Sequence, residues 1–240
     1  GHETGTHSLY HETVGDSLFE IPGTYPLLPE EVQPRIKLAT DILEDIVGHK
    51  VVSWRCPRLF GGTHVTNALE ALGYECDATY PMYFYNEQLF PYHPSQENWT
   101  EQGSLNLIEI IQFADMGMES KDDYGRDKDQ WPLYRTQSTE AFIPHIESFM
   151  SYLEKNDQSQ KPIVLCFYFH PWEFWEMPEG VIHFGEGGVL PDPFLTKGCG
   201  KYCLNQVELL IDWLKSKEAA FLTAGQCARK WHEILALQEI

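Results

Sequence analysis

The sequence predicts a single α/β domain with a parallel sheet, and three observations support this prediction. Apolar segments typical of strands and helices alternate four or five times along the chain. Residues 162–169 form a continuous apolar run of the kind that is buried on both faces of a parallel sheet. A chain of 240 residues with 42% hydrophobic residues can bury one substantial core. We therefore expect one domain over residues 1–240.

Helices are expected where apolar residues recur at steps of three and four. Gly48 and Gly73 end the first two of these patterns, as glycine commonly does at a helix C-terminus. Ser138 can cap a third helix, and Thr223 can start the last one as part of a capping box with Gln226. The expected helices cover residues 30–47, 63–72, about 138–155, the apolar positions from 204 to 214, and the segment after residue 223.

Short apolar runs between these helices are expected to form the strands, at residues 51–54, 74–77, 107–113, 162–169 and 220–222. The intervening segments at 15–29 and 171–200 are rich in Gly and Pro, which favours loops. Residues 114–138 are polar and charged, so we expect a solvated surface loop there.

The charge of the chain excludes several classes of partner. Its 36 acidic and 17 basic residues give a net charge of −19. Because no cluster of Lys and Arg offers a surface for phosphates, nucleic acids and anionic membranes are poor partners. No stretch reaches the roughly 18 consecutive apolar residues of a membrane span. Six Cys are too few for a disulfide scaffold, and only the loop pair Cys199 and Cys203 is a candidate bridge.

The first twelve residues hold three His and two Glu, which is the densest group of metal-binding side chains in the chain. His7 and His11 stand four apart, so a helical turn would place both rings on one side. Neutral imidazole is the commonest protein ligand of zinc. An expression-tag remnant or a frayed polar terminus is the alternative interpretation, and the interleaved Glu, Gly, Ser and apolar residues argue against a tag. The helical zinc-protease spacing does not fit, because His7 follows His2 by five residues.

Polar side chains also follow two of the predicted strands. Arg55 comes after residues 51–54, and His170 comes after residues 162–169. The carboxyl ends of parallel strands are where α/β barrels place their chemistry, although any single polar residue there is also compatible with an ordinary loop. Trp54 and Trp172 lie next to these residues. We expect Trp54 to pack in the core, and Trp172 either to pack or to stack on a sugar ring.

Three of these segments together resemble the NodB-homology polysaccharide deacetylases, carbohydrate esterase family 4. Residues 1–11 match the family pattern Gly-His-Glu-x-Gly-x-His followed by His-Ser/Thr-x-x-His. His7 and His11 are the two histidines of the second part, the box that binds the metal in the family. Residues 55–58, Arg-Cys-Pro-Arg, resemble the motif Arg-x-Pro-Tyr, and residues 167–170, Phe-Tyr-Phe-His, resemble the late motif Leu-x-His. The resemblance implies an irregular (β/α) barrel and a divalent metal, most simply Zn²⁺, bound by His7 and His11.

The resemblance also implies roles for residues around the metal. His170 would be the general acid that protonates the leaving amine, and Arg55 would hold the catalytic base by a charge-assisted contact. The backbone N–H of Arg58 would help to bind the oxyanion. Asp77 resembles an Asp that orients the general acid in part of the family, and a turn or helix-cap Asp is the alternative.

Two aromatic residues complete the expected site. Tyr168 stands where the family has Leu, so it would reshape the pocket for the acetyl methyl group. Trp172 is the candidate for stacking on the sugar. Both expectations concern substrate binding.

The family's first motif, Thr-Phe-Asp-Asp, has no counterpart in this chain. In the family it precedes the His box and supplies both the catalytic base and the third metal ligand. Asp16 and Asp41 lie in no comparable strand. We therefore expect the first strand and helix to be missing here, its own N-terminal segment to be a partner, and the isolated chain to be nearly inactive.

The function expected from the resemblance is metal-dependent removal of acetyl groups from N-acetylated amino sugars of a polysaccharide, such as peptidoglycan, a chitin-like polymer or an exopolysaccharide. The partner would be an acetylated glycan, and the family suggests an extracytoplasmic or cell-envelope location. An O-acetyl ester or cyclic-amide hydrolase with the same site is an alternative. A non-catalytic carbohydrate-binding remnant is another.

Overall fold

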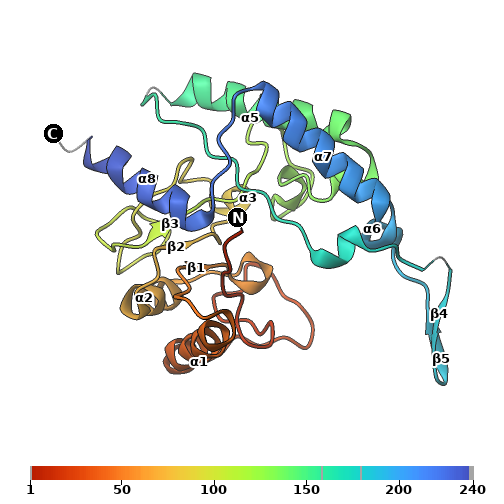
Figure 1. The fold of residues 1–240 in the computed structure, drawn as a ribbon, viewed down its shortest axis with the longest axis horizontal. Coiled ribbons are helices and arrows are strands. Elements are labelled where there is room, and N and C mark those ends of the chain that lie inside the picture. The colour runs from red at the N-terminus through yellow and green to blue at the C-terminus, as the bar shows by residue number, and fades with distance from the viewer. Residues whose placement is uncertain (1, 158, 179, 238–240) are drawn as a thin grey trace.

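The computed structural model describes residues 2–157, 159–178 and 180–237 of the chain (Figure 1). All five expected helices are confirmed, and none of the described helices is long and apolar enough to cross a membrane. The helices are α1 (Pro29–Val47), α2 (Thr63–Leu72), α3 (Met82–Tyr85), α4 (Leu133–Thr136), α5 (Thr139–Asn156), α6 (Pro193–Thr196), α7 (Lys201–Ser216) and α8 (Ala224–Ala236). Short 3₁₀ turns cover Pro57–Leu59, Arg126–Lys128 and Pro171–Phe174.

The main sheet consists of three parallel strands in the order β1 (Ser53–Trp54), β2 (Cys76–Asp77), β3 (Ile108–Glu109). Thr6 adds a single parallel bridge to β1. Helices α1 and α2 pack together beside β1, and α8 packs against β2 and β3 (Figure 1). The predicted parallel α/β arrangement is therefore confirmed. Within the described part of the chain, however, the sheet is small and open and does not close into a barrel.

Two predicted strands are not formed. Residues 162–169 form no regular strand, and they make one backbone hydrogen bond to the sheet side, from Phe113 N–H to the Cys166 carbonyl (2.9 Å). Leu165 and Phe167 pack against the core around α5 and α7, whereas Val164 and Cys166 pack against the core around α8. The segment is thus packed on both faces as predicted, but it lacks a ladder. Residues 220–222 are also irregular, and Phe221 is exposed.

A second layer, made by α4, α5 and α7, covers the other half of the molecule (Figure 1). Its core is aromatic: the rings of Phe142 and Phe149 meet Phe113 edge to face, with centroids 5.7 Å and 5.6 Å away. The predicted surface loop 114–138 contributes to this layer, since Tyr134 and Arg135 are buried. That loop prediction was therefore wrong for its last part. Cys199 and Cys203 are both free, so no bridge joins them.

The segment between the 3₁₀ turn Pro171–Phe174 and α6 carries a hairpin of β4 (Ile182–Phe184) and β5 (Gly187–Val189). It extends away from the rest of the molecule (Figure 1), and all residues of both strands are exposed.

Candidate active site

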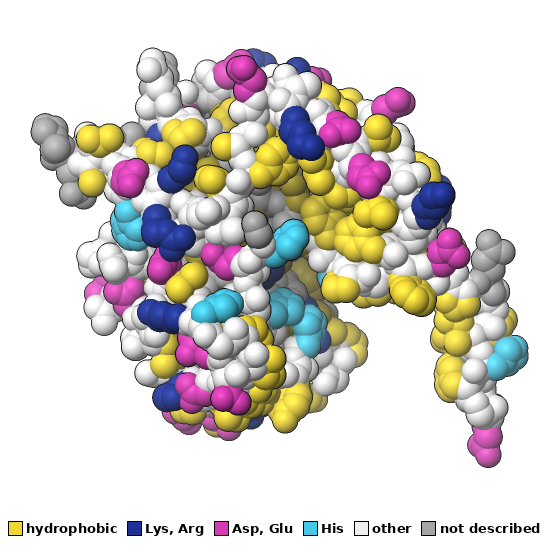
Figure 2. Space-filling view, viewed as in Figure 1, with side chains coloured by type: hydrophobic (Ala, Val, Ile, Leu, Met, Phe, Trp, Pro, Cys, Tyr) yellow, Lys and Arg dark blue, Asp and Glu magenta, His cyan; other side chains and the backbone are white. Residues whose placement is uncertain are grey.

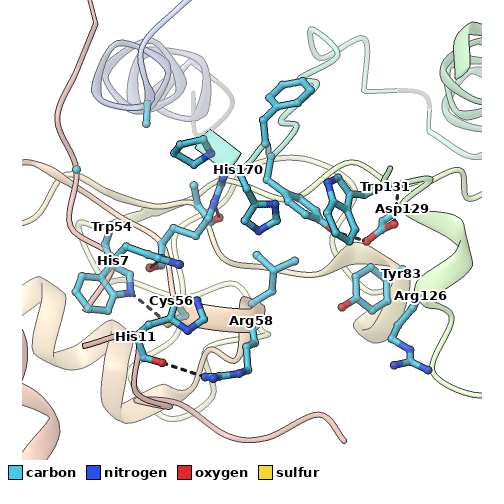
Figure 3. Close-up of a pocket in the computed structure, with 18 of the residues that line it drawn as sticks. His7, His11, Trp54, Cys56, Arg58, Tyr83, Arg126, Asp129, Trp131 and His170 are labelled. Atoms are coloured by element: carbon cyan, nitrogen blue, oxygen red, sulfur yellow. Dashed lines mark hydrogen bonds between the residues drawn. The ribbon is translucent and has the colours of Figure 1, made fainter. Parts of the chain in front are cut away.

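One cavity of about 880 Å³ brings together most of the residues singled out from the sequence. It opens where the two layers meet, and histidine side chains surround the hollow at the centre of the molecular face in Figure 2. The predicted site residues that line it are His7, His11, Arg55, Arg58, Tyr168 and His170 (Figure 3). Asp77 and Trp172 do not line it.

His7 and Arg55 reach the cavity from two adjacent parallel segments. The Thr6 N–H donates to the Ser53 carbonyl (3.0 Å), and the Arg55 N–H donates to the Thr6 carbonyl (3.1 Å). This close approach requires Gly5, because a Cβ atom there would lie 2.6 Å from the Ser53 Oγ. The glycine of the His box therefore positions His7 at the same edge of the sheet as Arg55.

The rings of His7 and His11 lie 5.1 Å apart with their planes at 66°. They do not sit on a helical turn, as the spacing predicted; residues 7–11 are irregular, and Ser8 and His11 have positive φ. A metal–nitrogen bond of about 2.1 Å plus a ring radius of about 1.2 Å puts two ligand centroids about 5.4 Å apart at a tetrahedral angle and about 4.7 Å apart at a right angle. The observed separation lies between these values, so the pair fits a metal.

The protonation of both rings also suits a metal ligand. The His7 Nδ1 lies 2.8 Å from the Arg55 carbonyl, which only accepts hydrogen bonds, so Nδ1 carries the proton and Nε2 is free to bind. Burial lowers the pKa of His7, against the effect of that hydrogen bond. Burial and the nearby Arg58 guanidinium lower the pKa of His11. Both imidazoles are therefore neutral near pH 7, as metal ligands must be.

His170 enters the cavity from the opposite wall, at the end of residues 162–169 (Figure 3). Its Nδ1 lies 3.0 Å from Glu173 Oε1, and its backbone N–H donates to the same oxygen (2.8 Å). Because an ionised carboxylate only accepts, Nδ1 carries a proton and Nε2 is available to the cavity. Trp131 meets the His170 ring edge to face at 5.1 Å and lines the same cavity.

Glu173 is fully buried and has an unusually complete set of donors. Besides His170, it accepts hydrogen bonds from the Tyr134 hydroxyl (2.6 Å), Trp131 Nε1 (3.1 Å) and Arg135 Nε (3.0 Å). Burial raises the pKa of Glu173, but the hydrogen bonds from His170, Tyr134 and Trp131 outweigh it and lower the pKa to about 2. Glu173 is therefore ionised next to the His170 ring.

Asp77 does not orient His170, which corrects the sequence-based assignment. The Thr79 hydroxyl donates to its Oδ1, and its Oδ2 has no hydrogen-bond partner among the described residues. Asp77 instead faces Glu109 across the register of β2 and β3. Burial raises the pKa of Asp77 to about 7, and burial together with Asp77 raises the pKa of Glu109. A sequence reading could have found Glu173 instead, because it follows His170 by three residues.

The two arginines hold the backbone of the site. Arg55 donates to the Ala78 carbonyl (2.8 Å) and to the Cys166 Sγ (3.3 Å), and it pairs with no carboxylate in the described ranges. Arg58 donates to the His11 carbonyl (3.1 Å) and so fixes the loop that carries this histidine. The expected role of Arg55, holding a catalytic base, stays a prediction.

Aromatic residues line the cavity. Tyr168 is among them, but the other predicted aromatic residue, Trp172, is not. Trp172 stacks on His170 with centroids 5.3 Å apart, and the Arg135 guanidinium also lies against it. Trp131 lines the cavity instead, next to Tyr168. Trp131 was not expected in the site because it lies in the segment predicted to be a solvated loop.

A carboxyl group that lines the cavity, Asp129, was not singled out from the sequence. Asp129 accepts a hydrogen bond from the Tyr168 hydroxyl (2.8 Å), and burial raises its pKa to about 7. A carboxyl with such a pKa can exchange protons near neutral pH. No group of three or more His, Cys, Asp or Glu side chains in residues 2–157, 159–178 and 180–237 is arranged to hold a metal ion. Among the described residues, His7 and His11 form a pair of imidazoles whose spacing is compatible with a metal ion.

Comparisons with known proteins agree with this fold. No family model matches the chain, and a search of curated proteins finds no match. A crystal structure of a probable polysaccharide deacetylase from Pseudomonas aeruginosa PAO1 is similar, with a TM-score of 0.51, 14% identity, and coverage of 97% of this chain and 60% of that one. A crystal structure of Puue Allantoinase is similar with a TM-score of 0.50, 14% identity, and the same coverage of 97% and 60%. The chain thus spans about 60% of the length of either protein and shares its fold with a deacetylase and an allantoinase.

Proposed function

We propose that this chain carries the site of a metal-dependent hydrolase that removes acetyl groups from N-acetylated amino sugars of a polysaccharide. The observation that supports this most is the convergence of His7, His11 and His170 on one cavity from segments more than 150 residues apart in sequence. The shared fold with a protein described as a polysaccharide deacetylase supports the same class of reaction.

His7 and His11 would hold the metal, with zinc as the ion that best suits two neutral imidazoles. Bound there, a divalent metal supplies Lewis acidity, which polarises a carbonyl oxygen and lowers the pKa of water to about 7. The neutral state of both rings favours binding near pH 7 and above, because protons compete with the metal at lower pH.

His170 would donate a proton to the leaving nitrogen through Nε2. Glu173 holds Nδ1, so the ring keeps one orientation, and its negative charge offsets the positive charge that His170 carries when both nitrogens are protonated. The backbone N–H of Arg58 would serve the oxyanion of the tetrahedral intermediate. The general base stays an expectation, because in the family it belongs to the first motif, which has no counterpart in this chain.

The lining of the cavity fits a sugar substrate. Trp131, Tyr168 and Tyr83 present aromatic rings beside polar groups, and sugar rings pack on such faces through their C–H bonds. The volume of about 880 Å³ is near the upper end of the roughly 300–1,000 Å³ typical of small-molecule sites, which suits a segment of a glycan.

The first test is acetate release from acetylated chito-oligosaccharides by the complete protein in the presence of zinc, followed by mass spectrometry over long incubations. His170→Ala should lower the rate by about 10²- to 10⁴-fold and leave the zinc content unchanged. His7→Ala combined with His11→Ala should remove the activity together with the zinc ion that this pair binds. Unaltered turnover in His170→Ala would refute its role, and glycan binding without any acetate release would favour a binding module.

A second candidate is hydrolysis of a small cyclic amide, which the structural likeness to an allantoinase favours. The same residues would serve, because both reactions cleave a carbon–nitrogen bond next to a carbonyl group. A panel of acetylated chito-oligosaccharides, O-acetylated xylan and allantoin separates these activities.

A further inference from the structure

A second pair of imidazoles lies outside the candidate active site. His93 belongs to the segment between α3 and β3, and His232 belongs to α8. Their ring centroids are 4.8 Å apart with the planes at 47°, and neither residue lines the large cavity. The pair therefore joins the last helix to a segment far away in the sequence.

A hydrogen bond of the His93 ring shows which of its nitrogens is free in the neutral state. The His93 Nδ1 lies 2.7 Å from the Leu105 carbonyl, so it carries the proton and leaves Nε2 unprotonated in the neutral ring. His7 is held in the same way by the Arg55 carbonyl. No hydrogen bond within the described ranges engages the His232 ring, so its nitrogens are free to bind.

The spacing of the rings agrees with two ligands of one metal ion. With metal–nitrogen bonds of about 2.1 Å, ligand centroids are about 4.7 Å apart at a right angle and about 5.4 Å apart at a tetrahedral angle. The observed 4.8 Å corresponds to the first of these angles.

The electrostatic surroundings also favour a cation. Glu70 and Glu75 act on His232 as nearby negative charges, and Glu70 is held in place because it accepts a hydrogen bond from the Leu107 N–H (2.8 Å). Burial and then His93 lower the pKa of His232, so this ring is neutral near pH 7. A chain with a net charge of −19 adds a favourable field.

We propose that His93 and His232 bind a divalent transition-metal ion such as zinc, at a site separate from the candidate active site. Water would occupy the remaining coordination positions. The ion would fasten α8 to the segment before β3. Because a metal that binds only the folded chain stabilises it, zinc should raise the melting temperature through this site.

The test is a zinc titration by calorimetry in a chain that carries His7→Ala and His11→Ala, so that the candidate active site does not contribute. Two further variants then remove one ligand each. His232→Ala deletes the imidazole on α8. His93→Asn keeps a donor near the Leu105 carbonyl and deletes only the Nε2 ligand, which protects the local fold. His49→Ala is the matched control, because the His49 Nδ1 also contacts a carbonyl (Lys50, 3.0 Å) but no second ring of the described residues packs on it.

We expect the starting chain and His49→Ala to bind one zinc ion with the same affinity and to melt at higher temperature with zinc. Substitution of a residue that only hydrogen-bonds a metal ligand weakens metal affinity by roughly 10- to 100-fold. His93→Asn and His232→Ala each remove a ligand itself, so each should weaken zinc binding by more than that. Circular dichroism without zinc checks that each variant folds. Absence of zinc binding in the starting chain, or unchanged affinity in either ligand variant, would overturn the site. Since His7 and His11 take no part, these outcomes are independent of the proposed hydrolase activity.

Discussion

Two buried acidic sites in this molecule differ in charge although neither has any exposed surface. The Glu173 and Asp77 side chains are both 0% exposed. Glu173 accepts hydrogen bonds from four different residues, and its pKa falls to about 2. Among the described residues, Asp77 accepts a hydrogen bond from the Thr79 hydroxyl, its Oδ2 has no partner, and it faces Glu109; burial raises its pKa to about 7. The donors around a buried carboxyl group, rather than burial itself, decide whether it is charged.

This difference assigns separate roles to the two acids. An ionised carboxylate can hold an imidazole in one tautomer, and Glu173 does so for His170. Asp77 and Glu109 lie side by side in the sheet, where two negative charges would repel each other. The pair therefore retains a proton near neutral pH. Glu173 belongs to the candidate active site, and the Asp77–Glu109 pair belongs to the core.

The largest effect should come from Glu173→Gln. The substitution leaves the fully buried Arg135 without its ion-pair partner, which typically destabilises a protein by about 3–5 kcal/mol. It also replaces the charged acceptor of His170 Nδ1 by a neutral amide that can present either an acceptor or a donor, so turnover by the folded protein should fall by about 10²- to 10⁴-fold. Urea unfolding measures the first effect, and acetate release well below the melting temperature measures the second.

Asp77→Asn is the control for Glu173→Gln, because it neutralises a buried acid that has no donor from His170. It should leave the pH dependence of turnover unchanged, whereas Glu173→Gln should alter it. If both variants change the pH–rate profile equally, Glu173 has no special role in positioning His170.

Most of the fold could be predicted from the sequence, since helix patterns are local. The steps of three and four and the terminal residues Gly48, Gly73 and Thr223 placed the long helices correctly. Strands depend on partners that are distant in sequence. Residues 162–169 have the apolar pattern of a buried strand, but they meet a single backbone donor from Phe113, and a pattern cannot show how many neighbours a segment will find.

The site residues that belong to sequence motifs could be predicted. Those whose place in the site depends on contacts made only in the folded chain could not. His7, His11 and His170 share one cavity, as the motifs suggested. The orienting acid depends on which carboxylate reaches Nδ1, and that contact is set by the turn at residues 171–174 rather than by a strand end. Trp131 was missed for a related reason, because its charged neighbours conceal a residue that packs inward.

The next effect concerns the pH dependence of stability. The folded-state pKa of Asp77, about 7, lies above the unfolded value of about 3.9, so the folded chain keeps a proton that the unfolded chain releases. The contribution of Asp77 to stability therefore falls as the pH rises from about 4 to 7. Asp77→Asn should flatten this fall and raise the free energy of unfolding at pH 8 by on the order of 2 kcal/mol.

Urea unfolding between pH 4 and pH 8 measures this change. Asp122→Asn is the control, because hydrogen bonds from Arg126 lower the pKa of Asp122 to about 2, so its contribution is lost only below about pH 4. An Asp77→Asn chain that loses stability with pH as steeply as the unaltered chain would show that Asp77 is ionised in the core.

The smallest effect isolates one donor to Glu173. Tyr134→Phe removes the hydroxyl that donates to Glu173 Oε2 at 2.6 Å and keeps the ring that packs on Phe169. Tyr92→Phe is the matched control, because the buried Tyr92 hydroxyl donates at 2.7 Å to the neutral carbonyl of Trp99. Since a hydrogen bond to a charged group contributes more than one to a neutral group, Tyr134→Phe should cost about 1 kcal/mol more than Tyr92→Phe in urea unfolding at pH 7. Equal losses would mean that the Glu173 carboxylate is not charged in the folded protein, whereas the expected difference would show that its donors keep it ionised beside His170.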